Sequence, residues 1–265
     1  MTRPRLLCRS AVVVLLLSMA HAHLSAESRA KAPDSAATPI LVELFTSEGC
    51  SDCPPADDLL ARLDRSQPVA GAQLIVLSEH VDYWNDIGWK DPYSSHAYSE
   101  RQSAYARRFG LDGVYTPQMV VDGKFQFVGS DERRAVTAAE KAAKELKIRM
   151  SLSGAHLESE TALSVHLDAG QLPSIAKRPA SVLVVIADER DESHVIGGEN
   201  GGRTLRHVAV LRRIKQVGSL DRANGLSEDV SIEIPRRDER MRLIAFAQDE
   251  EDGTIWGVAS TRFSK

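Results

Sequence analysis

Two cysteines separated by two residues, Cys50 and Cys53, are the clearest candidates for chemistry in this sequence. Such a pair can close into a disulfide and reopen, and so exchange two electrons with a partner. The loop between them is too short for the bond to stabilise a fold much, which favours chemistry over a structural role. Glu48 precedes the pair and Asp52 lies between the two cysteines, and their charge disfavours a thiolate. The pattern therefore indicates a reducing or isomerising site rather than a strong oxidant, with an inert disulfide as the alternative.

A second set of candidates follows an apolar run at residues 72–78 that reads as a buried strand. His80 can act as a base, a thiolate partner or a metal ligand, and Asp82 can orient it or assist proton transfer from the buried thiol. Loops after adjacent parallel strands share one edge of a sheet, so we expect this loop to approach the cysteines. Cys50, Cys53 and His80 are also three ligands suited to copper(I) or zinc, without an evident fourth. A metal-binding protein is thus an alternative.

Other motifs carry weaker signals. Three aromatic side chains of the same loop can form a substrate platform or cover the core: Tyr83, Trp84 and Trp89. The glycine-rich residues 197–203 lack the Lys-Ser/Thr ending of a P-loop, so they read as a flexible connection between strands. Four basic side chains alternate within strand-like sequence and predict a solvated face: Arg206, His207, Arg212 and Arg213.

The N-terminus has the composition of a secretory signal peptide. Three arginines precede an apolar run, residues 11–20, that is too short to span a bilayer. Small residues permit cleavage after Ala22 or Ala26. We assign residues 1–26 to the signal peptide, with an uncleaved anchor as the alternative, and residues 27–38 to a flexible lead-in. The mature protein is then expected to be periplasmic or secreted.

Composition restricts the classes of partner. The chain has 265 residues, of which 43% are hydrophobic and 26% charged, as in ordinary folded proteins. Signal cleavage removes Cys8 and three arginines, which leaves 30 basic against 37 acidic residues. An acidic chain is a poor candidate for binding nucleic acid or anionic membranes, and no later segment is apolar enough to span a membrane.

Hydrophobic periodicity predicts a strand, helix, strand, helix, strand, strand, helix order between residues 39 and 148. A helical crossover joins the first two strands, which should therefore be parallel, and Asp122-Gly123 predicts a closing hairpin. This is the element order of a thioredoxin fold, with the cysteine pair after the first core strand. A cis-proline precedes the hairpin in that fold, which here corresponds to Thr116-Pro117. There it would hold Thr116 beside the sulfurs to pair with substrate, whereas a trans proline opening a strand is the alternative.

After residue 148 the pattern changes to seven short strands without clear helices. They are expected at residues 149–152, 162–167, 181–188, 206–214, 229–234, 242–248 and 255–260. The sequence therefore predicts an α/β fold class with two domains. A thioredoxin-like domain over residues 39–148 would precede a β-rich, antiparallel, sandwich-like domain over residues 149–265.

Three motifs in order carry a family resemblance: VELFTSEGCSDCPPADDLL, HVDYWNDIGWKDPY and VYTPQMVVDG. Together they resemble the secreted bacterial proteins catalogued as domain of unknown function 1223, within the thioredoxin-like superfamily. Two later pieces, GRTLRHVAVLRRI and AFAQDEEDGTIWGVA, are also similar. The resemblance implies a thioredoxin-like domain with an appended C-terminal region, and no known substrate. Unlike thioredoxins, the chain has no aromatic residue before the motif, and Pro54 directly follows the second cysteine.

These observations predict a periplasmic or secreted thiol–disulfide oxidoreductase-like protein. The expected roles are attack by Cys50, resolution by Cys53, substrate positioning by Thr116 and Pro117, and tuning of the site by His80 and Asp82. Turnover needs no dissociable cofactor, but it needs a protein thiol or disulfide substrate and an electron partner. The C-terminal domain is expected to dock a partner or cover the groove. A non-enzymatic interaction module with an inert disulfide is a further alternative.

Overall fold

The structure is a computed structural model that describes residues 1–2, 37–234 and 240–264. The chain divides into two units, Met1–Ser35 and Ala36–Lys265, and every helix and strand described below belongs to the second. The predicted signal peptide, apart from its first two residues, and nearly all of the lead-in lie outside the described residues. No helix in the described ranges is long and apolar enough to cross a membrane.

Local structure follows the sequence patterns closely. The helices are α1 (Pro54–Ser66), α2 (His96–Phe109) and α3 (Glu132–Ala142). The strands before α3 are β1 (Thr38–Thr46), β2 (Ala72–His80), β3 (Gln118–Val121) and β4 (Phe125–Val128). The strands after it are β5 (Met150–Leu157), β6 (Ala162–Ala169), β7 (Ala180–His194), β8 (Thr204–Leu220), β9 (Leu226–Glu233), β10 (Arg240–Gln248) and β11 (Ile255–Ser264).

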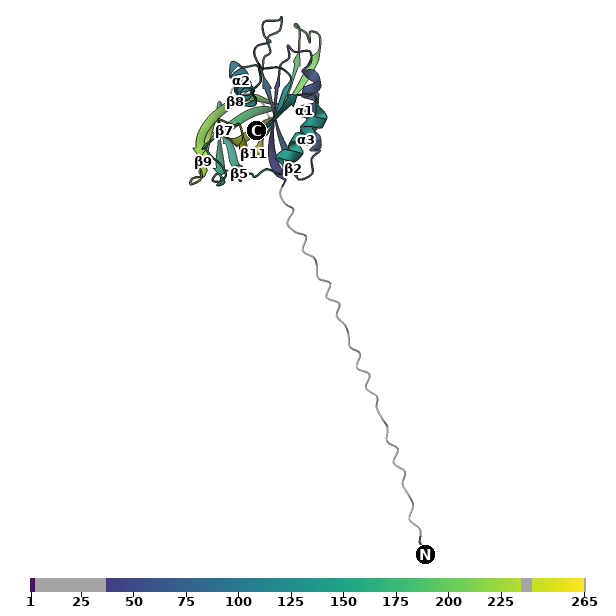
Figure 1. The fold of residues 1–265 in the computed structure, drawn as a ribbon, viewed down its shortest axis with the longest axis vertical. Coiled ribbons are helices and arrows are strands. Elements are labelled where there is room, and N and C mark those ends of the chain that lie inside the picture. The colour runs from purple at the N-terminus through teal and green to yellow at the C-terminus, as the bar shows by residue number, and fades with distance from the viewer. Residues whose placement is uncertain (3–36, 235–239, 265) are drawn as a thin grey trace. The chain divides into compact units, whose positions relative to one another are not determined.

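The way in which the strands assemble differs from the prediction. Eight strands form one mixed sheet in the order β11-β10-β7-β8-β2-β1-β3-β4, and β5-β6-β9 form a separate small sheet. Strands β1 and β2 are parallel, as expected, but β2 also pairs with β8 through Ser78 and Val210. The edge of β2 is therefore occupied by a strand from the C-terminal half (Figure 1).

The prediction of a helix-flanked thioredoxin-like α/β domain followed by a β sandwich is consequently wrong. The described chain is mostly β, and four of its seven C-terminal strands extend the sheet that the N-terminal strands begin. The predicted boundary at residue 148 falls between α3 and β5, and strands from both sides of it share that sheet. The physical reason is that β7 is buried on both faces over most of its first nine residues, as in the interior of a large sheet.

Helices α1 and α3 contact one face of β1, and helix α2 contacts the other. Alternate β1 residues Ile40, Val42 and Leu44 pack with α1 and α3 in one core cluster, and Figure 1 shows these two helices side by side. Phe45 points to the opposite face, where it packs against Tyr105 of α2. The loop that leaves β1 therefore leads into a helix on one face of the sheet, and the loop that leaves β2 leads into a helix on the other.

One buried charge cluster ties α2 to the sheet. The Arg101 guanidinium contacts Glu43 of β1 at 2.5 Å and Glu79 of β2 at 3.5 Å, and both carboxylates are fully buried. Tyr105 donates a hydrogen bond to Glu43 at 2.6 Å. Burial raises the pKa of Glu79 well above its ordinary value, against the opposing charge of Arg101. Glu43, the single charge in an apolar strand, is therefore explained by this cluster.

The third helix is short. Its N-cap is Asp131, whose side chain accepts a hydrogen bond from the backbone N–H of Arg134. The helix ends at Ala142, and Leu146, which lies beyond it, is 56% exposed.

Candidate functional site

The two cysteines form a disulfide in the turn between β1 and α1. Their Cα atoms lie 5.4 Å apart, and the backbone N–H of Cys53 donates to the carbonyl of Cys50. Cys53 is the N-cap of α1, and Pro54 opens the helix, where a missing N–H costs nothing. Cys50 therefore lies in the turn before the helix rather than at its first residue. The side chains of Cys50 and Cys53 are 1% and 0% exposed, so neither sulfur is at the surface.

The loop after β2 reaches this turn through Asp91. One Asp91 oxygen accepts hydrogen bonds from the backbone N–H of Glu48 at 2.9 Å and from His80 Nδ1 at 2.7 Å. Burial alone would raise the pKa of Asp91, but the His80 charge and these hydrogen bonds hold it below its ordinary value. The predicted approach of the two loops is thus present, and Asp91, not Asp82, orients His80.

The central feature of the site is a buried histidine from the C-terminal half. His207 of β8 is 2% exposed, and its Nε2 lies 3.1 Å from Glu48 Oε1. Its Nδ1 lies 3.8 Å from Asp57 of α1. Burial lowers the pKa of His207, but interactions with Asp57 and Glu48 outweigh it and raise the pKa to about 10. The imidazole is therefore a cation between two buried carboxylates.

Asp57 links this charge to the second cysteine. It lies four residues after Cys53 on α1, so the two side chains share one face of the helix. One of its oxygens accepts a hydrogen bond from Thr46 at 3.2 Å, and the other is buried without a hydrogen-bond partner. A carboxylate in this place can take a proton from a neighbouring thiol.

Glu48 is also held from several directions. Trp89 Nε1 donates to it at 2.8 Å, and Ser193 of β7 donates to its other oxygen. The cationic His207 compensates its charge. The sequence argument that Glu48 disfavours a thiolate at Cys50 is therefore weakened, because that argument counted an uncompensated acid.

The connection between β7 and β8 is hydrogen-bonded to the cysteine turn. We call residues 195–203 the strap. Its Asn200 is fully buried and donates to the carbonyls of Glu48 and Cys50, both at 2.9 Å. Glu199 accepts a hydrogen bond from the backbone N–H of Ser51 at 2.9 Å. The strap therefore binds the cysteine turn through its backbone on both sides of Cys50.

Glycines allow this close approach. A Cβ atom at Gly197 would lie 2.1 Å from the carbonyl oxygen of Gly88, far inside van der Waals contact. Gly88 itself has φ +97°, which disfavours any side chain. The strap and the loop after β2 consequently pack backbone against backbone.

The remaining predicted site residues divide into two groups. The Thr116–Pro117 peptide bond is cis, as expected, and Thr116 accepts a hydrogen bond from Trp84 Nε1 at 2.9 Å. Trp84 also lies against Gly49, whose added Cβ would meet it at 3.0 Å, so it connects this segment to the cysteine turn. Asp82 instead pairs with Ser99 and His96 at the start of α2.

His80 packs against a second histidine of the site. Its ring lies 4.6 Å from that of His207 and 5.3 Å from that of Tyr93, measured between centroids. Its Nε2 is buried without a hydrogen-bond partner. Within the described ranges, no three His, Cys, Asp or Glu side chains are grouped to hold a metal ion, so the proposed set of Cys50, Cys53 and His80 gains no support.

Sequence reasoning missed His207 and Asn200. The expectation that His207 lies on a solvated face is wrong, since it is buried between α1 and the sheet. The expectation of a flexible connection at residues 197–203 is wrong for Asn200, which is fully buried against the cysteine turn. The repeated glycines of residues 197–203 could have indicated this packing, because glycine permits close backbone approach as well as flexibility.

Comparison with known proteins gives a family and a fold. Residues 41–248 match the family described as "Protein of unknown function (DUF1223)". A crystal structure of an Agrobacterium tumefaciens protein is 25% identical, with a TM-score of 0.63 over 84% of this chain and 94% of that one. HBP35 of Porphyromonas gingivalis is 13% identical, with a TM-score of 0.59 over 86% and 75%, which shows a similar fold alone. No match to this chain is found among curated proteins.

Proposed function

Because the chain belongs to the DUF1223 family, which assigns no activity, we propose from the site itself that Cys50 and Cys53 perform thiol–disulfide exchange. One observation carries this proposal. A disulfide that closes a very short loop adds little stability, yet here it lies within a buried set of ionisable side chains. Those side chains are Glu48, Asp57, His80, Asp91 and His207. Burying a charged side chain costs free energy. Ionisable side chains whose pKa values are shifted by burial and by neighbouring charges are frequent at reactive centres.

The exchange proceeds in two balanced steps when the reduced pair meets a substrate disulfide. The Cys50 thiolate attacks one substrate sulfur, forms a mixed disulfide and releases the other substrate sulfur as a thiolate, which takes up a proton. Cys53 then gives its proton to Asp57 and attacks the Cys50 sulfur. This restores the Cys50–Cys53 disulfide and releases the second substrate thiol, so two electrons pass from the pair to the substrate. The reverse sequence oxidises a substrate dithiol.

In this proposal the strap opens to admit the substrate. Cys50 is 1% exposed, and Asn200 donates a hydrogen bond to its carbonyl, so movement of the strap would loosen the turn that holds the sulfur. Trp84 connects the cis Thr116–Pro117 segment to the cysteine turn, and the proposed role of Thr116 is to pair with an extended chain there. The substrate in this proposal is an extended protein segment, and a separate dithiol or disulfide protein resets the pair.

The compartment is a further part of the proposal. A disulfide persists in an exported, oxidising environment, to which the signal-like residues 1–26 would direct the chain. The signal peptide and the periplasmic or secreted location therefore belong to the proposal, and peptide mapping of the mature N-terminus tests them.

The decisive experiment traps the intermediate. Cys53→Ser leaves Cys50 free to form a mixed disulfide that cannot resolve, so covalent adducts that dithiothreitol releases are expected after expression in a bacterial periplasm. The Cys50→Ser, Cys53→Ser double variant is the matched control and should form none. Equilibration of the wild-type protein with glutathione buffers gives the potential of the pair and the direction of electron flow.

The complete burial of both sulfurs favours one other candidate, an interaction module with an inert disulfide. Reduction by dithiothreitol and trapping of adducts distinguish the two proposals. A pair that stays oxidised in excess dithiothreitol under native conditions, and yields no trapped adducts, establishes the inert module and excludes exchange.

A further inference from the structure

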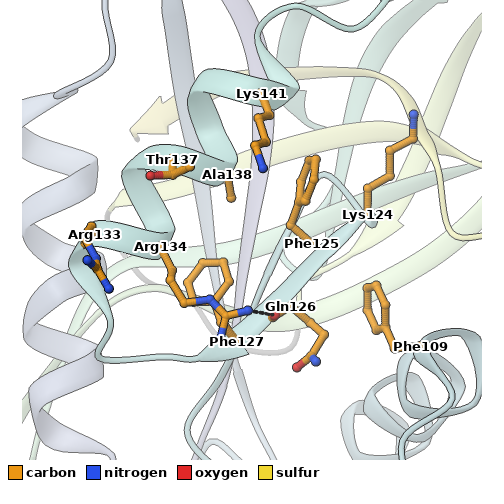
Figure 2. A pocket seen from close by; sticks show the side chains of 10 residues that line it. All are labelled: Phe109, Lys124, Phe125, Gln126, Phe127, Arg133, Arg134, Thr137, Ala138 and Lys141. Atoms are coloured by element: carbon orange, nitrogen blue, oxygen red, sulfur yellow. Dashed lines mark hydrogen bonds between the residues drawn. The ribbon is translucent and has the colours of Figure 1, made fainter.

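A second site lies away from the cysteines, along the outer edge of the large sheet. Strand β4 is the last strand in the sheet order, so one of its edges pairs with no strand of the described chain. A groove of about 620 Å³ follows this edge between β4 and α3, with Phe109 at the end of α2 on its far side. Figure 2 shows the side chains that line it. We call it the β4 groove.

Cations dominate the lining of the β4 groove. Four basic side chains line it: Lys124, Arg133, Arg134 and Lys141. The described lining includes no Asp or Glu, although Lys124 pairs with Glu145 nearby at 3.0 Å. The chain as a whole carries a net charge of −4, so this groove is a basic site on an acidic protein. The charge of the groove therefore favours an anionic ligand.

Aromatic rings hold two of these cations in place. The Arg134 guanidinium lies 5.3 Å from the centre of the Phe127 ring, and the Lys141 ammonium lies 6.0 Å from that of Phe125. Phe125 and Phe127 are two residues apart on β4, so they face the same side, toward α3. The groove thus presents an apolar floor with charges fixed above it.

The free edge of β4 offers backbone groups as well. The carbonyl of Gln126 accepts a hydrogen bond from Arg134 at 3.4 Å, so it points away from β3 toward the groove (Figure 2). A weak bond of this length to a long side chain is easily exchanged for a backbone N–H at normal distance. A free strand edge flanked by a helix is an arrangement that extended peptides use to add a strand.

We infer that the β4 groove binds an extended acidic peptide, which pairs with the free edge of β4 while its carboxylates contact the cations of α3. Alternate residues of an added strand point to the same side, so acidic side chains at every second position would meet Arg134 and Lys141 together. The inference rests on the groove alone and does not require exchange at Cys50 and Cys53.

The test uses a fluorescein-labelled peptide of alternating glutamate and valine, measured by fluorescence anisotropy with the wild-type protein. Arg134→Glu with Lys141→Glu should weaken binding at least about tenfold, because both contacts become repulsive. Lys177→Glu with Arg222→Glu carries the same change of charge on exposed loops and should leave binding unchanged. Arg134→Gln with Lys141→Gln replaces the first variant if charge reversal prevents folding, with a smaller loss expected.

A second peptide separates strand addition from simple charge attraction. Proline at alternate positions removes backbone donors while keeping the glutamates, and it should abolish binding. Hydrogen exchange should slow at β4 amides when the parent peptide is bound. Equal binding of the proline peptide, equal loss in the two charge-reversal variants, or no binding of the parent peptide each overturns the inference.

Discussion

Replacement of Asn200 by alanine tests whether the strap controls access to the disulfide. The Asn200 amide donates to the carbonyls of Glu48 and Cys50 at 2.9 Å, and its oxygen accepts a hydrogen bond from Arg203 at 2.7 Å. In an open strap these carbonyls would be hydrated. The substitution therefore removes bonds that exist in the closed state and leaves the open state nearly unaffected.

The expected effect follows from the two lost backbone contacts. Each neutral hydrogen bond contributes about 1 kcal/mol net, so the closed strap should lose about 2 kcal/mol. A difference of 1.4 kcal/mol is tenfold in an equilibrium, so the open population should increase about 30-fold. If reduction of the Cys50–Cys53 disulfide proceeds through this opening, its rate should increase by the same factor.

The assay follows reduction by dithiothreitol under native conditions, with alkylation of free thiols and mass spectrometry at each time point. Leu167→Ala is the matched control, because Leu167 is fully buried in β6 of the small sheet and its truncation costs about 2–5 kcal/mol. This control destabilises the whole unit without touching the strap, so its reduction rate should stay close to that of the wild type.

Two results would refute the reasoning. An unchanged rate in Asn200→Ala would mean that the strap does not limit access to Cys50. An equal acceleration in Leu167→Ala would mean that the disulfide is reached through global unfolding, and the strap would then have no gating role.

Three further predictions concern the buried charges. The pKa of His207 is raised from 6.5 to about 10, so its stabilising effect is complete below pH 6.5 and is lost as pH rises through about 10. Urea unfolding should therefore show stability falling over this range in the wild type but not in His207→Gln. Asp57→Asn should slow resolution of a mixed disulfide about tenfold or more in stopped-flow assays, whereas Asp58→Asn, at an exposed position of the same helix, should not. Arg101→Met leaves Glu43 buried beside a second acid and should cost about 3–5 kcal/mol in urea unfolding, and a loss below 1 kcal/mol would contradict the charge cluster.

Local structure could be predicted from the sequence because local causes set it. Continuous apolar runs marked β1 and β2, paired prolines opened α1, and Gly110 ends α2 with φ +64°. The Asp122-Gly123 turn has positive φ at both residues, as its hairpin signal requires. Each of these features depends on a few neighbouring residues, which a single sequence displays.

The pairing of strand edges could not be predicted in the same way. Nothing local in residues 72–80 distinguishes an edge strand from one whose second edge is taken by β8. The continuous apolar run at residues 182–187 is a hint, since a strand buried on both faces belongs inside a sheet. Alternation in neighbouring strands favoured a sandwich instead, and the sheet that spans both halves was missed.

The candidate site shows the same limit. Cys50, Cys53 and the Thr116–Pro117 bond follow from spacing and element order, whereas the partner of Glu48 is a histidine 159 residues further along the chain. Only the pairing of β8 with β2 brings His207 to α1. A site that depends on an unpredicted strand pair cannot be completed from sequence periodicity.

The C-terminal half of the chain therefore contributes directly to the cysteine site. It supplies the cation that compensates Glu48, the asparagine that donates a hydrogen bond to the Cys50 carbonyl, and the strand that occupies the edge of β2. A fragment ending at residue 148 would lose all three, and it would leave a buried carboxylate beside the disulfide without its counter-ion. If Cys50 exchanges disulfides as proposed, its partner would meet a cysteine turn that the strap holds through its backbone. The C-terminal half would then contribute to the choice of partner, even though both sulfurs belong to the N-terminal half.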